Sequence, residues 1–114
     1  MTSLQTAQLY FDLSNKSDFE GIAKLFTKDT VYHSANTGDY VGTDTILKMQ
    51  KAFHGKFKQL HWHVNSVEEE EPGTILFDYD FSATTKDGEQ VSGSGLEYVG
   101  VVDGKITRVE IKNK

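Results

Sequence analysis

The second half of this chain alternates apolar and polar residues between turns that contain glycine, and this pattern constrains the fold more than any other feature. The pairs Asp87-Gly88 and Asp103-Gly104 are typical of tight hairpin turns. An alternation of period two is typical of strands with one face buried. The predicted strands are 60–64, 75–81, 91–102 and 106–111. Since hairpins join neighbouring strands, the pattern predicts one antiparallel sheet.

Three amphipathic helices are predicted before this sheet, because apolar residues recur there at helical spacing. The first covers residues 2–15, and the third ends at Gly55. The predicted N-terminal caps are Thr2, then Ser17, then Thr43 or Asp44. Two short strands, 30–34 and 40–41, lie between the second and third helices. The predicted fold class is α+β, with three helices covering one face of the sheet in a single domain of residues 1–114.

Composition and charge exclude several classes of protein. The chain has no cysteine, which rules out disulfide and thiolate chemistry and fits a reducing compartment. We expect a cytoplasmic protein, since no signal peptide or long apolar segment is visible. The net charge is −5, and the dense run 68–71 is acidic, so neither a nucleic acid nor a membrane is an expected partner.

The order of the predicted elements resembles the nuclear-transport-factor-2-like superfamily. The segments that carry the resemblance are 18–26, 30–34, 42–46 and 102–106. Within the superfamily the chain is most similar to SnoaL-like proteins, which include polyketide cyclases, and ketosteroid isomerase is a more distant relative. The resemblance implies a cystatin-like cone, in which a curved antiparallel sheet with a mixed edge surrounds the helices and leaves an apolar pocket at its mouth.

The resemblance also implies a catalytic set made of His33, Tyr10 and Glu97. His33 matches the carboxylate base of ketosteroid isomerase, and Tyr10 matches its oxyanion-donating tyrosine. Glu97 matches an acidic residue that the isomerase and the cyclases both carry. In such a site His33 takes a proton, while Tyr10 and protonated Glu97 stabilise the enolate. Because histidine replaces the carboxylate base, steroid isomerisation itself is not implied.

His33 and Tyr10 also have purely structural interpretations. A strand histidine can bond a carbonyl of the following turn, and a helical tyrosine can pack in the core with its hydroxyl towards water. Alternation along the strand points His33 inward if Val31 belongs to the core. The sequence leaves both interpretations open.

The face on which Glu97 lies depends on one hairpin. With a two-residue turn at Asp87-Gly88, Glu97 pairs with Asp78 and lies opposite to Phe77. One bulge in the strand, which the resemblance favours, would bring Glu97 inward instead. A carboxyl group buried in an apolar pocket would have a raised pKa and could donate a hydrogen bond. An exposed strand carboxylate is the alternative.

Other residues are assigned by their type and position. The expected pocket-lining residues are Met49, Phe53, Trp62, Phe77, Tyr79 and Phe81. His61 and His63 lie two apart on a strand, a spacing that permits metal binding, but no third ligand is apparent, so exposed or dimer-facing histidines are the favoured interpretation. His54 is expected to interact with the C-terminus of its own helix.

The sequence therefore predicts a small-molecule pocket protein without a cofactor. If it is an enzyme, it performs acid–base isomerisation, cyclisation or dehydration of an apolar carbonyl compound. The alternative is a non-catalytic ligand-binding or association domain, since this fold supports both. A homodimer through the outer sheet face is also expected, with Leu76, Val99, Val101 and the His61/His63 row as candidates to form it.

Overall fold

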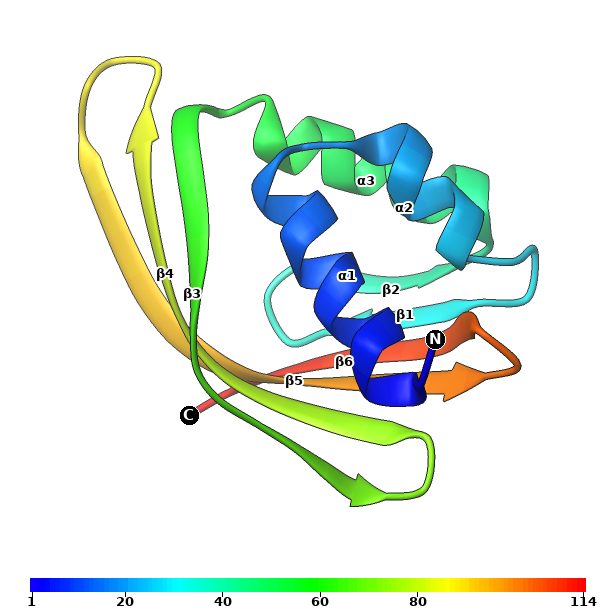
Figure 1. The fold of residues 1–114 in the computed structure, drawn as a ribbon. Helices are drawn as coiled ribbons and strands as arrows, with labels where there is room; N and C mark the ends of the chain where they lie inside the picture. The colour runs from blue at the N-terminus through cyan, green and yellow to red at the C-terminus, as the bar shows by residue number, and fades with distance from the viewer.

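A computed structural model describes residues 1–114 and shows three helices inside the curve of one six-stranded sheet (Figure 1). The helices are α1 (Ser3–Asn15), α2 (Phe19–Leu25) and α3 (Thr43–His54). The strands are β1 (Val31–Ser34), β2 (Gly38–Val41), β3 (Phe57–Glu71), β4 (Thr74–Thr85), β5 (Gln90–Val102) and β6 (Lys105–Asn113). The element order and the α+β class predicted from the sequence are confirmed.

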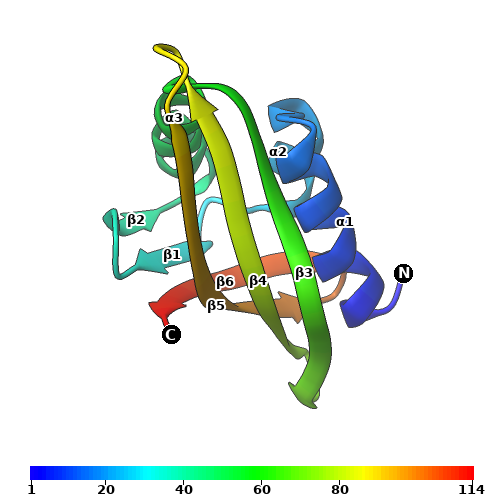
Figure 2. The same cartoon turned by 90° about the vertical axis from the view of Figure 1, so that its left-hand side faces the viewer.

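The sheet has the strand order β2-β1-β6-β5-β4-β3 and is antiparallel except at one junction. β1 and β6 are parallel, which gives the sheet its mixed edge. The long strands β3, β4 and β5 bend so that one end of the sheet curls around the helices (Figures 1 and 2). Three register shifts in the β3–β4 pair accompany this bend, since bulges increase local twist.

The hairpin between β4 and β5 decides which face Glu97 occupies. Thr85 and Glu89 close a three-residue loop by backbone hydrogen bonding, with Gly88 at φ +92°. The register then runs without a shift and pairs Phe77 with Glu97 on the inner face. Glu97 thus points inward, but the bulge expected within β5 was wrong: the extra residue lies in the loop, where it reverses the faces just as a bulge would.

The helix caps agree with the sequence only in part. Thr2 forms the predicted capping box with Gln5 at the start of α1. The cap of α2 is Asp18 rather than Ser17, and α3 begins after Gly42 without a side-chain cap. Ser17 has a φ of +52°, which turns it out of the capping position. The single-residue errors arise because neighbouring Ser, Thr and Asp residues can all serve as caps.

One core joins the helices to the concave face of the sheet. Phe11 of α1 stacks on Phe77 of β4 with ring centroids 4.0 Å apart. Val99 and Val101 of β5 are 0% and 5% exposed within the same core. These two valines were expected on the outer face, and that expectation was wrong because the β4–β5 loop places odd-numbered β5 residues inward.

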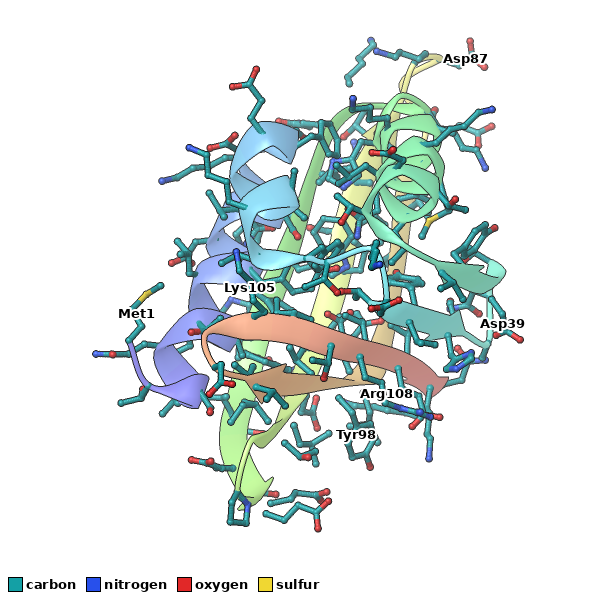
Figure 3. All side chains as sticks on the ribbon, turned by 90° about the vertical axis from the view of Figure 1, so that its right-hand side faces the viewer. Met1, Asp39, Asp87, Tyr98, Lys105 and Arg108 are labelled. Atoms are coloured by element: carbon teal, nitrogen blue, oxygen red, sulfur yellow. The ribbon has the colours of Figure 1, made fainter.

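The outer face of the sheet is largely polar. Tyr98 and Arg108 project from it on the side away from the helices (Figure 3). Leu76 pairs with Tyr98 there, whereas His61 and His63 are exposed on β3. Of the residues expected to form a dimer contact, Leu76, His61 and His63 lie on this face. Val99 and Val101 do not.

Candidate functional site

A cavity of about 170 Å³ opens between the helices and the concave face of the sheet. Its walls come from α1, α3 and five of the strands, and most of the large side chains are aromatic. The aromatic lining residues are Tyr10, Phe11, Tyr32, Phe53, Trp62, Tyr79 and Phe81. No lysine or arginine lines the cavity. It therefore suits a neutral, largely apolar molecule better than an anion.

Glu97 is the only carboxyl group in the cavity lining. Its side chain points inward from β5 and is 5% exposed. Burial raises the pKa of Glu97 from 4.5 to about 8, since no cation lies nearby to stabilise the charged form. The carboxyl group is therefore protonated at neutral pH and available as a hydrogen-bond donor.

Three tyrosines from three different elements surround Glu97. Burial, and next the charge of Glu97, raise the pKa of Tyr10 well above its usual value and that of Tyr79 to about 12. Burial likewise raises the pKa of Tyr32. All three phenols stay protonated across the range in which Glu97 titrates. The cavity thus holds a cluster of neutral O–H groups.

Gly95 makes room for Tyr79 in this cluster. The two residues are cross-strand neighbours, and a Cβ atom at Gly95 would lie 2.7 Å from the Tyr79 hydroxyl oxygen. Any larger residue would collide with the phenol in its present position. Gly95 therefore serves close packing of a side chain, and the bulge that the sequence suggested does not occur in this strand pair.

Gln50 enters the same cluster from α3. It is 6% exposed and donates a hydrogen bond from Nε2 to the Tyr10 hydroxyl oxygen over 2.9 Å. Ile46 and Phe53 lie one turn away on either side of it, so a polar residue occupies the apolar face of the helix. That interruption was a signal in the sequence which the helix assignment overlooked.

His54 is the imidazole that lines the cavity. Its Nδ1 lies 2.8 Å from the Ser17 hydroxyl oxygen, and its ring packs edge-on against Phe19. Partial burial lowers the pKa of His54, so the ring is neutral at pH 7 and able to accept a proton. The expectation that His54 serves only the helix terminus missed this position.

His33 lies apart from Tyr10 and Glu97. Its pairing partner across the sheet is Glu110, whereas Glu97 pairs with Ile111, so His33 and Glu97 are on opposite faces. Its Nδ1 contacts the Asp39 carboxylate over 2.8 Å, at the exposed edge that Figure 3 shows. The expectation that His33 faces the pocket was wrong, because Tyr32 and not Val31 is the buried residue of β1.

Of the six side chains expected to line the pocket, five do so and one lies in the core. Met49, Phe53, Trp62, Tyr79 and Phe81 line the cavity. Phe77 does not, since it is 1% exposed beneath Phe11 and belongs to the core. The lining residues that sequence reasoning missed include Tyr32, Ser34, Gln50 and His54.

Two further features bear on the class of protein. No three His, Asp or Glu side chains gather in a geometry that could hold a metal ion, and His61 and His63 remain a pair. None of the three helices has the length and apolar character that a bilayer-spanning helix requires.

A family model of the SnoaL-like domain matches residues 7–109, which is most of the chain. The chain belongs to the SnoaL-like domain family. Among curated proteins, a sequence search finds no match. The SnoaL-like assignment agrees with the cone of helices and sheet that the structure shows, and with the resemblance noted in its sequence.

Solved structures share this SnoaL-like fold at low sequence identity. A putative SnoaL-like polyketide cyclase from Shewanella denitrificans OS-217 superposes with a TM-score of 0.86 at 12% identity, covering 96% of this chain and 88% of its own. AclR, a putative hydroxylase from Streptomyces galilaeus, gives 0.82 at 22% identity, covering 98% and 88%. A protein from Catenulispora acidiphila DSM 44928 with a ketosteroid isomerase-like fold, in complex with trimethylamine, gives 0.86 at 10%, covering 100% and 88%.

Proposed function

We propose that the cavity binds a small apolar carbonyl compound and performs cofactor-independent acid–base chemistry on it: isomerisation, cyclisation or dehydration. The observation that supports this most directly is Glu97, a neutral carboxylic acid at pH 7 in an aromatic cavity. A protonated acid of this kind donates to a carbonyl oxygen and stabilises the negative charge that develops when a neighbouring proton is removed.

The remaining roles follow from the lining residues. The Tyr10 hydroxyl, which already accepts from Gln50, keeps its own proton for the same carbonyl oxygen. His54 is neutral and lines the same cavity, so it is the proton acceptor in the proposed reaction. His33 has no part in it, because it contacts Asp39 on the other face.

Proton exchange tests the chemistry without knowledge of the natural substrate. In D₂O the protein should accelerate replacement of the α-hydrogens of 2-tetralone, a flat bicyclic ketone, as followed by proton NMR. Glu97→Leu, which removes the donor, should reduce the acceleration about 10²–10³-fold, the usual effect of losing an oxyanion donor. His33→Ala is the matched control and should exchange at the wild-type rate.

Binding without exchange would favour the second candidate, a non-catalytic ligand-binding domain of the same fold. The polar groups in the cavity support binding equally well, and fold does not decide between the two. Trp62, the single tryptophan of the chain, lines the cavity and reports occupancy by its fluorescence. An exchange rate equal to the buffer rate, at a 2-tetralone concentration that saturates this signal, would contradict catalysis.

The affinity for 2-tetralone should depend on pH through Glu97. The acid donates only when protonated, so binding should be constant from pH 6 to 7 and then weaken above pH 8 by up to about tenfold per pH unit. The measurement is a Trp62 fluorescence titration at each pH. Glu97→Gln should bind with no such pH dependence, and a wild-type profile equally flat to pH 9.5 would contradict the assignment.

A small organic cation should show the opposite pH dependence of binding. The Catenulispora relative was crystallised with trimethylamine, and aromatic walls around a carboxylate attract alkylammonium ions. If tetramethylammonium binds this cavity, its affinity should rise as Glu97 ionises near pH 8. Tighter binding of tetramethylammonium than of 2-tetralone at pH 7 would favour an amine ligand over a carbonyl compound.

We also propose a homodimer formed through the outer sheet face. Leu76 and Tyr98 are partly exposed there and supply apolar surface. A stable dimer would bury about 1,200–2,000 Å² in total. Sedimentation velocity should show a dimer that Leu76→Lys dissociates, and a wild-type monomer at high micromolar concentration would contradict the proposal.

A further inference from the structure

Gln50 carries the one buried side-chain oxygen or nitrogen that has no hydrogen-bond partner. Its Nε2 donates a hydrogen bond to the Tyr10 hydroxyl oxygen, whereas its Oε1 is shielded from solvent and has no partner. Native proteins pair nearly all buried polar atoms, so an unpaired one needs an explanation. Gln50 lines the cavity, and the missing partner can therefore come from a bound molecule.

The hydrogen bond to Tyr10 determines which hydrogen-bonding group a bound molecule must carry to pair with Gln50. An amide oxygen only accepts hydrogen bonds, so Oε1 requires an O–H or N–H group. Since Tyr10 accepts from Gln50, its own O–H remains able to donate, and the candidate acceptors are the Ser14 hydroxyl and a ligand oxygen. The cavity thus presents an acceptor, Gln50 Oε1, next to two donors, Tyr10 and protonated Glu97.

We infer that Gln50 is a specificity-determining residue and that the ligand carries a hydroxyl or N–H group in addition to its carbonyl oxygen. The inference rests on the proposed carbonyl site and narrows its ligand class to hydroxylated or amino-substituted ketones. A ligand without the donor leaves Oε1 unpaired in a dry site and binds more weakly. A pocket built to pair a polar group discriminates strongly against an analogue that lacks it.

Bicyclic ketones that differ in one substituent test this directly. The probes are 1-indanone, its 4-, 5- and 6-hydroxy derivatives, and the three corresponding methoxy compounds, titrated at pH 6 with Trp62 fluorescence as the readout. At least one hydroxyindanone should bind about 10- to 100-fold more tightly than 1-indanone. Its methoxy counterpart, which accepts but does not donate, should show no gain.

Variants assign the preference to Gln50. Gln50→Met keeps the length and helix propensity of the side chain and should abolish the preference for the hydroxyl. Tyr10→Phe should weaken all the ketones and should also reduce the preference, because the Gln50 amide loses the hydrogen bond that orients it. Gln8→Met, a change of the same type at an exposed position of α1, should bind as wild type does. Circular dichroism checks that each variant is folded, and the comparison of hydroxy and methoxy probes in the wild type requires no variant.

The outcomes separate this inference from the proposed function. If all the indanones bind equally, or the methoxy compounds bind best, the inference is overturned while the carbonyl site stands. If Gln50→Met retains the preference for the hydroxyl, Gln50 does not determine it. A clear preference without α-hydrogen exchange contradicts the proposed catalysis alone. Absence of binding by every probe overturns both.

Discussion

Glu97→Gln is expected to stabilise the protein progressively as the pH rises from about 5 to 8. The folded state holds the Glu97 proton up to a pKa of about 8, whereas the unfolded chain releases it near 4.5. Between these values the folded wild type binds one proton more than the unfolded chain, so its free energy of unfolding falls with increasing pH. The loss is about 1.4 kcal/mol per pH unit and totals a few kcal/mol.

Urea denaturation of both proteins at pH 4, 5, 6, 7, 8 and 9 measures this difference. Below pH 4.5 the curves should nearly coincide, because Glu97 is then neutral in both states. Above pH 8 the gap should stop widening. Glu89→Gln changes an exposed carboxylate and should follow the wild type throughout. A constant difference between Glu97→Gln and wild type across the whole range would mean that the carboxyl group titrates normally.

A residue that destabilises the fold at neutral pH is consistent with a functional role. A glutamine of the same shape could occupy the site without the cost of ionisation. The buried acid therefore contributes nothing to folding that its neutral analogue would not. Its chemistry gives a reason for its presence, since strained or costly groups concentrate at functional sites.

Phe77→Ala should cause the largest loss of stability among the aromatic residues near the site, about 3–5 kcal/mol. The ring is 1% exposed and stacked on Phe11, so its removal leaves a closed cavity in the core. Phe81→Ala, on the same face of β4 but half-buried at the cavity wall, should cost less, because that ring already borders open space.

Chemical denaturation of the two variants distinguishes core from wall. The effects on ligand binding should have the opposite order. Phe81→Ala should weaken 2-tetralone binding, whereas Phe77→Ala should bind normally at temperatures where it remains folded. Equal destabilisation by the two substitutions would contradict the division between core and cavity that the structure shows. That result would also support the sequence prediction that Phe77 lines the pocket.

The sequence by itself determined the architecture. Period-two alternation and two glycine turns predicted a sheet of long strands, and helical spacing predicted the helices, because these patterns reflect local backbone geometry. The family resemblance pointed to Tyr10 and Glu97 as site residues, and the structure brings both into one cavity.

Only the tertiary structure decided which residues share the cavity. The side of the sheet on which Glu97 lies depends on one extra loop residue near Gly88, and no local pattern distinguishes a two-residue from a three-residue hairpin there. His33 and His54 could not be ranked by chemistry alone, since each is an imidazole near a turn. Their roles differ because β1 buries Tyr32 and turns His33 outward, while α3 ends with His54 against the cavity. The direction in which each side chain points depends on contacts between segments far apart in the chain. The residues next to it in the sequence do not determine those contacts.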